Sequence, residues 1–145
     1  MSDNLYMMGR IGETSVAIPA ESVEAVVRIG AVVPAPGAPA CVRGLVAIRS
    51  RILTLIDCAL ATGEANDGDA PFMAIVSVDG HGYALSFNAV EDVAVLPEPT
   101  PARGAVSPGW ARLDPQMVDH WGQVMLVIDP AKLIAVATSL PRLVA

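Results

Sequence analysis

The sequence predicts a mainly β protein, built from two small five-stranded β-barrels that share an interface and carry a few short helices. Composition is the first observation behind this prediction. The chain has 145 residues, of which 19 are Val and 9 are Ile, and these β-branched side chains pack well on pleated sheets. The 12 Gly and 12 Pro residues are typical of short strands joined by tight turns. Length is the second observation, because 145 residues allow one ordinary domain or two small subdomains.

An internal repeat is the third observation. Residues 23–29 align with residues 90–96, and residues 52–59 align with residues 124–131, in the same order and with nearly equal offsets. Two copies are too few for a solenoid. A chance match between aliphatic segments is the alternative, and the shared order weighs against it. We therefore expect one domain over residues 1–145, with approximate repeat halves over 5–63 and 72–136, a linker over 64–71, and strands that can exchange between the halves.

The first half shows short apolar segments separated by turn residues. The expected strands cover residues 5–11, 14–18, 23–29, 42–49 and 51–56. Gly12 and Glu13 lie at the turn of the first hairpin, and Ser50 lies at the turn of the second. The three prolines of residues 34–39 exclude a central strand there, because each lacks a ladder donor. Asp57 is expected to cap a short helix that runs through Leu60 and ends at Gly63.

The second half repeats this organisation. The expected strands cover residues 72–78, 83–87, 89–96 and 124–128, and the segment 118–122 leads into the last of them. A long loop rich in Pro and Gly is expected over residues 97–109. Asp129 followed by Pro130 is a strong helix start, and we expect that helix to run through Val136. Residues 137–145 are left unassigned.

Charge and composition exclude several classes of protein. The net charge of −6 argues against nucleic-acid binding, which needs clustered Lys and Arg. A hydrophobic content of 53% is too high for a disordered chain. No apolar run approaches the roughly 20 residues of a membrane span, and the N-terminus lacks the pattern of a secretory signal. We therefore expect a cytoplasmic protein without membrane insertion, in which Cys41 and Cys58 are buried thiols rather than a disulfide.

No catalytic, cofactor-binding or metal-binding arrangement is predicted. His81 and His120 both fall at expected hairpin tips, and neither has further ligand-type residues at metal-binding spacing. His120 follows Asp119, which could orient its imidazole for base catalysis, but no serine or cysteine is paired with it in sequence. Asp57 and Asp129 are explained as helix caps at equivalent repeat positions. Hence an enzyme is not expected.

One cluster of basic residues stands out against the acidic background. Arg43, Arg49 and Arg51 lie within nine positions and share strand parity, although the turn at Ser50 interrupts the strand. A solvated strand face would explain them. A partner-binding patch is the functional alternative, since arginine forms directed bonds to carboxylates and is enriched at interfaces.

Residues 36–57, PGAPACVRGLVAIRSRILTLID, carry a more specific signal. They resemble the signature of the CheW-like domain family, in which P-x-x-P precedes a V-x-G strand, an N-L-R-G turn and an aliphatic strand that closes with D-L. The resemblance extends more weakly over about the whole chain. It implies two SH3-like five-stranded barrels around a shared core, which would also account for the repeat.

The resemblance further implies a non-enzymatic adaptor in chemotaxis. Family members couple the cytoplasmic tips of chemoreceptors to the regulatory domain of the CheA-type histidine kinase, in membrane-associated arrays. The residues that match family elements at partner-binding positions are Arg49, Val23, Val26, Val42, Gly44 and Leu45, with Arg43 and Arg51 added from the basic cluster. No cofactor is implied.

The sequence departs from the family pattern at four positions. Ala47 and Ser50 replace the Asn and Gly of N-L-R-G, Ala25 replaces the Glu of the V-x-E-V element, and Asn88 replaces an acidic residue in the second half. Glu24 stands one position before Ala25, and strand alternation predicts that it points to the opposite face. A coupling module in pilus motility or gene regulation, and a small-molecule-binding barrel, remain as alternatives.

Overall fold

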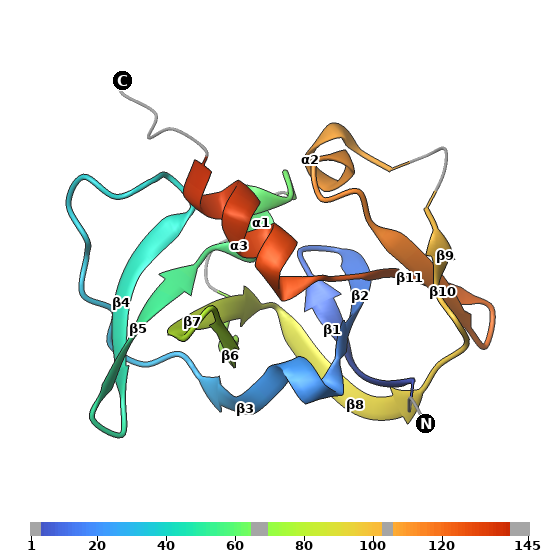
Figure 1. Ribbon diagram of the computed structural model, residues 1–145, viewed down its shortest axis with the longest axis horizontal. Helices are drawn as coiled ribbons and strands as arrows, with labels where there is room; N and C mark the ends of the chain where they lie inside the picture. The colour runs from blue at the N-terminus through green and yellow to red at the C-terminus, as the bar shows by residue number, and fades with distance from the viewer. Residues whose placement is uncertain (1–3, 65–69, 103–105, 140–145) are drawn as a thin grey trace.

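The computed structural model describes residues 4–64, 70–102 and 106–139, and within them the chain forms two β-sheets with a few short helices (Figure 1). Sheet A contains, in spatial order, β8 (Ala89–Val95), β1 (Leu5–Ile11), β2 (Thr14–Pro19), β11 (Gln123–Val127), β10 (Gln116–His120) and β9 (Thr100–Pro101). Sheet B contains β3 (Val23–Arg28), β6 (Phe72–Val78), β7 (His81–Phe87), β5 (Arg51–Ile56) and β4 (Val42–Ile48). The mainly β prediction is confirmed.

Apart from β9 at one edge of sheet A, the two sheets have equivalent strand orders. In each sheet, an edge strand pairs antiparallel with the first strand of a hairpin, and another strand pairs parallel with the second strand of that hairpin. The parallel strand also pairs antiparallel with the strand that precedes it in the chain. The segments that align in sequence occupy equivalent places: β3 and β8 are edge strands, and β5 and β11 are the parallel strands. Sheet A takes its hairpin β1–β2 from the start of the chain, whereas sheet B takes β6–β7 from beyond the middle. The two sheets therefore exchange hairpins.

Three clusters of buried side chains explain why so many strands are apolar on both faces. The central cluster lies between the sheets and includes Ile18 of β2, Val76 of β6 and Ile128, all nearly inaccessible to solvent. A second cluster belongs to sheet B, and a third belongs to sheet A. In β6, Ala74 and Val76 join the central cluster while Met73 and Ile75 join that of sheet B. Alternate residues of β6 therefore pack into two different clusters, and for this reason the sequence of the strand is a continuous apolar run.

Two of the helices pack on the central cluster and begin where the sequence predicts. Asp57 caps α1 (Cys58–Ala61), because its carboxylate accepts a hydrogen bond from the Leu60 N–H at 3.1 Å. Asp129 does the same for α3 (Pro130–Ser139) by accepting from the Ala131 N–H at 3.0 Å. Leu133, Ile134 and Ala137 of α3 are buried against the core, and the helix lies across the middle of the molecule in Figure 1. It extends three residues beyond the expected end at Val136.

The loop expected over residues 97–109 contains regular structure. The two-residue strand β9 pairs with β10, and α2 (Pro108–Ala111) follows. The sequence pattern predicted neither element, because proline and glycine are typical of loops. Strand β9 ends on Pro101, and α2 begins with Pro108 and Gly109. The 3₁₀ turn η1 (Ala20–Ser22) lies between β2 and β3. The linker expected over 64–71 falls mostly on residues 65–69, which lie outside the described residues.

Glu64, at the start of that predicted linker, joins three parts of the fold. Its carboxylate accepts hydrogen bonds from the buried Trp110 Nε1 at 2.7 Å, from Thr14 Oγ1 at 2.7 Å, and from the Glu13 N–H at 3.1 Å. These donors belong to α2, β2 and the β1–β2 turn. Glu64 thereby ties the end of α1 to sheet A. Charge-assisted bonds of this kind are stronger than neutral ones.

We predict that Glu64→Ala lowers the free energy of unfolding by about 2–3 kcal/mol, because the buried indole N–H of Trp110 loses a charged acceptor. Urea denaturation followed by circular dichroism measures this change. Glu13→Ala is the matched control: its side chain is exposed, and only its backbone N–H contacts Glu64, so its effect stays within about 0.5 kcal/mol. Equal stability of the two variants would contradict the assigned role of Glu64.

Candidate partner-binding surface

Strand β3 carries partly buried valines that pack against two clusters, and charged residues that are exposed. Val23 and Val26 are half-buried and pack against the central cluster, whereas Val27 packs against the cluster of sheet B. A β-bulge interrupts the pairing of β3 with β6 between Val23 and Ala25. Glu24 at this irregularity and Ala25 after it are both exposed. Because β3 is an edge strand, its outer side is open to a partner.

A cation–π contact lies at the C-terminal end of β3. The Arg28 guanidinium carbon lies 5.1 Å from the centre of the Phe72 ring, and the two residues are register partners in the β3–β6 pair. Phe72 is half-buried and packs against the central cluster. Sequence reasoning missed both residues, since nothing local in the chain indicates that β3 pairs with a strand from beyond the linker.

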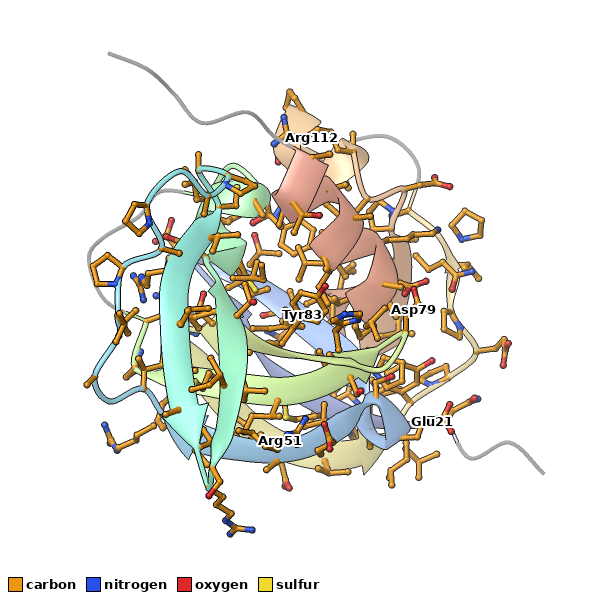
Figure 2. The ribbon with its side chains drawn as sticks, turned by 60° about the vertical axis from the view of Figure 1, so that its left-hand side comes forward. Glu21, Arg51, Asp79, Tyr83 and Arg112 are labelled. Atoms are coloured by element: carbon orange, nitrogen blue, oxygen red, sulfur yellow. The ribbon has the colours of Figure 1, made fainter. Side chains whose placement is uncertain are left out.

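Charge is distributed unevenly along β3. A hollow of about 350 Å³ lies beside its start, between η1, the end of β6 and the start of α3, and Glu21, Glu24 and Asp129 are among its lining residues. Figure 2 shows Glu21 and Asp79 on this side of the molecule. At the other end of the strand stands Arg28, which is exposed. The candidate surface is therefore acidic at the start of β3, apolar along it, and basic at its end.

The three arginines of the basic cluster do not form one strand face. Arg49 and Ser50 make a two-residue turn with positive φ angles of 46° and 70°, so Arg49 belongs to the turn and not to β4. Arg43 is half-buried at a β-bulge between Val42 and Gly44. The shared parity expected from the sequence is therefore wrong, because both the bulge and the turn break the strand alternation.

Arg51 links this hairpin to β3. Its Nη1 atom lies 3.4 Å from Oε1 of Glu24, and the two side chains are 50% and 45% exposed. An ion pair this exposed contributes roughly 0–1 kcal/mol, so both side chains can exchange their partner for another protein. Figure 2 shows Arg51 near the end of the β4–β5 hairpin. Arg49 is also exposed at the tip of the same hairpin.

Val42, Gly44 and Leu45 hold the proline-rich loop in place. Leu45 and Val33 exchange two backbone hydrogen bonds, at 2.8 and 2.9 Å, and the Val42 N–H donates to the Pro39 carbonyl at 3.0 Å. Gly44 is buried with a φ of 153°, and a Cβ there would clash with the Val33 carbonyl oxygen. These structural roles are sufficient to explain why Gly44 and Leu45 stand at their positions, whether or not a partner also contacts them.

The thiols in this region are not poised to react. Cys41 and Cys58 are both free and buried, and burial raises the pKa of each thiol above its ordinary value. Such thiols stay protonated near neutral pH. Among the described residues no group of three or more His, Cys, Asp or Glu could hold a metal ion, and none of the helices is long and apolar enough to cross a membrane.

The structure defines a β module of two sheets with a repeated strand order. The particular family follows from the sequence: the model of the CheW-like domain family matches residues 5–138, and the chain belongs to that family. No curated protein sequence matches the chain. Among solved structures, the scaffolding protein TtCheW from Thermoanaerobacter tengcongensis is similar, with a TM-score of 0.78, 18% sequence identity, and coverage of 89% of this chain and 86% of that chain. The expected CheW-like fold is confirmed.

We predict that Gly44→Ala lowers the free energy of unfolding by about 2–3 kcal/mol, because the new methyl group meets the Val33 carbonyl in a backbone conformation that suits only glycine. Chemical denaturation measures the loss. Gly30→Ala is the control, since a Cβ at Gly30 meets no atom within 4 Å. If Gly44→Ala were as stable as Gly30→Ala, the loop would not be held by this close approach.

Proposed function

We propose that the chain is a non-enzymatic coupling adaptor of chemotaxis signalling, which joins the cytoplasmic tips of chemoreceptors to the regulatory domain of a CheA-type histidine kinase. The observation that carries this proposal is the family match over residues 5–138. The fold shared with a protein described as a scaffolding protein supports it. In this role the chain works in the cytoplasm of a bacterium and is recruited to membrane receptor arrays without entering the membrane.

The β3 surface suits the helical hairpin of a receptor tip. An amphipathic helix docks by laying apolar side chains on an apolar strip, and Val23 and Val26 provide partly buried valines of this kind. Charged ends of the strip fix the direction of a helix, because opposite charges must meet. In the proposal Arg28 faces an acidic residue of the partner, while Glu21 faces a basic one.

Arg49 suits the kinase contact in this proposal. It projects from a two-residue turn, where the backbone is fixed at both ends by the β4–β5 ladder. A guanidinium held on a rigid turn loses little freedom when it binds a carboxylate or a backbone carbonyl. Arg51 lies beside it and can contribute by leaving its weak pair with Glu24.

The departures from the family pattern change contacts more than the fold. Ala47 is exposed on β4, so the absent asparagine side chain would have faced solvent or a partner. Ser50 holds the left-handed conformation that the family's glycine adopts freely. Asn88 keeps a structural role, because its Oδ1 accepts a hydrogen bond from the Gly12 N–H at 2.7 Å. We therefore expect altered partner selectivity on an intact scaffold.

We predict that Arg49→Ala weakens binding to the kinase regulatory domain about tenfold or more, as expected when an interface arginine is truncated, and leaves thermal stability nearly unchanged because the side chain is exposed. Isothermal titration calorimetry measures the dissociation constant, and thermal unfolding checks the fold.

Lys132→Ala is the charge-matched control, since Lys132 is exposed on α3 and lies outside the candidate surface. It should bind like the unaltered chain. Unchanged affinity of Arg49→Ala, or an equal loss in Lys132→Ala, would count against a specific contact at the β4–β5 turn.

A further inference from the structure

The ion pair between Glu24 and Arg51 crosses sheet B. Arg51 begins β5 and Glu24 lies on edge strand β3, and strands β7 and β6 stand between them. Three strand spacings amount to roughly 14 Å along a sheet. The Nη1 atom of Arg51 nevertheless lies 3.4 Å from the Oε1 atom of Glu24, and Figure 2 shows Arg51 beside β3. The pair therefore connects two strands that are not neighbours in the sheet.

Gly82 of β7 leaves the space that the Arg51 guanidinium occupies. A Cβ atom at Gly82 would lie 2.8 Å from the Nη2 atom of Arg51, and it would also meet the side chain of Leu53. Gly82 is not among the glycines with a positive φ angle, so its backbone conformation would suit other residues. The absence of a side chain, rather than backbone freedom, is what allows Arg51 to lie across β7.

Sheet A carries different residues at the equivalent positions. The strand registers and the sequence repeat give the sheet A equivalents of Arg51, Gly82 and Glu24, which are, in this order, Gln123, Ser15 and Glu91. The Gln123 side chain contacts the neighbouring strand, where its Nε2 atom donates a hydrogen bond to Ser15 Oγ at 2.6 Å. The Glu24–Arg51 bridge is therefore a property of sheet B and not of the fold that the two sheets share. Sheet B is also the sheet that carries β3 and the β4–β5 turn.

The pair joins the two contact sites that the proposed function assigns. Glu24 lines the acidic hollow at the start of β3, where a basic residue of a receptor tip would pair with it. Arg51 follows the Arg49–Ser50 turn, where a carboxylate or carbonyl of the kinase would accept a hydrogen bond from it. The side chains of Glu24 and Arg51 are 45% and 50% exposed, so each is within reach of a partner. Either partner breaks the same ion pair when it makes its own contact.

We infer that the Glu24–Arg51 pair couples the two binding events, so that a bound receptor tip strengthens binding of the kinase regulatory domain, and the reverse. The first partner breaks the pair, and the second then binds without that cost. The gain is the same in both directions, because it is a coupling free energy between two sites. An exposed ion pair is weak, which limits the gain in affinity to about fivefold. This inference rests on the proposed function and adds to it a regulation of each partner by the other.

Isothermal titration calorimetry with the kinase regulatory domain measures the gain, on the chain alone and on the chain saturated with a chemoreceptor cytoplasmic fragment. For the unaltered chain, the kinase dissociation constant should fall roughly two- to fivefold when the receptor fragment is bound. In Glu24→Gln the ion pair is absent and Arg51 is already available. The gain should therefore disappear, and this variant alone should bind the kinase as tightly as the unaltered chain does with receptor.

Glu91→Gln is the matched control, since it removes the same charge at the equivalent exposed position of sheet A. It should keep the full gain. Arg51→Gln removes the other member of the pair and should abolish the gain, as Glu24→Gln does. All three side chains are exposed, so thermal unfolding should show each variant folded. If one of the two pair variants unfolds, the other decides the question.

An unaltered chain without any gain, or a gain that persists in Glu24→Gln, would overturn the inference and leave the proposed function intact. A gain lost in Glu91→Gln as well would assign the effect to total charge, and would also overturn the inference. Failure of the receptor fragment or of the kinase domain to bind at all would instead contradict the proposed function, and the coupling with it.

Discussion

The exchange of hairpins between the two sheets is the constraint on which the rest of the structure depends. Hairpin β1–β2 completes sheet A, and hairpin β6–β7 completes sheet B, so neither sheet can form from one half of the chain. Each half alone would bury a marginal core, whereas the exchange creates the central cluster between the sheets. Glu64 reinforces this junction through Trp110 and Thr14. Strand β3 of the candidate surface pairs with β6, which comes from beyond the predicted linker.

This architecture explains how a small chain poor in aromatic residues can serve as an adaptor. Contact with a partner requires fixed surfaces, and the repeat supplies two related sheets with exposed hairpin tips at different places on the molecule. The tips have diverged: one carries Arg49 and the other carries Trp121. Edge strand β3 adds an apolar strip with charge of opposite sign at its two ends. In the proposed role, these surfaces are the candidate contact sites.

Features encoded locally could be predicted from the sequence. The Asp57 and Asp129 caps, the hairpins, and the fold class follow from turn residues and apolar alternation over short windows. Long-range contacts could not be predicted, because an apolar strand does not reveal its neighbour. The bond between Trp110 and Glu64 spans 46 residues, and the Arg28–Phe72 contact depends on the β3–β6 register. The parity assigned to Arg49 failed because a two-residue turn and a bulge reset the alternation.

Simultaneous binding is the central claim of the adaptor account, and co-sedimentation of three components tests it most directly. The chain would be mixed with a chemoreceptor cytoplasmic fragment and a CheA-type regulatory domain, and the complexes resolved by sedimentation velocity. The account predicts a ternary complex, because it assigns the receptor to the β3 surface and the kinase to the β4–β5 turn. Binding of neither component, or binding in which each displaces the other, would contradict it.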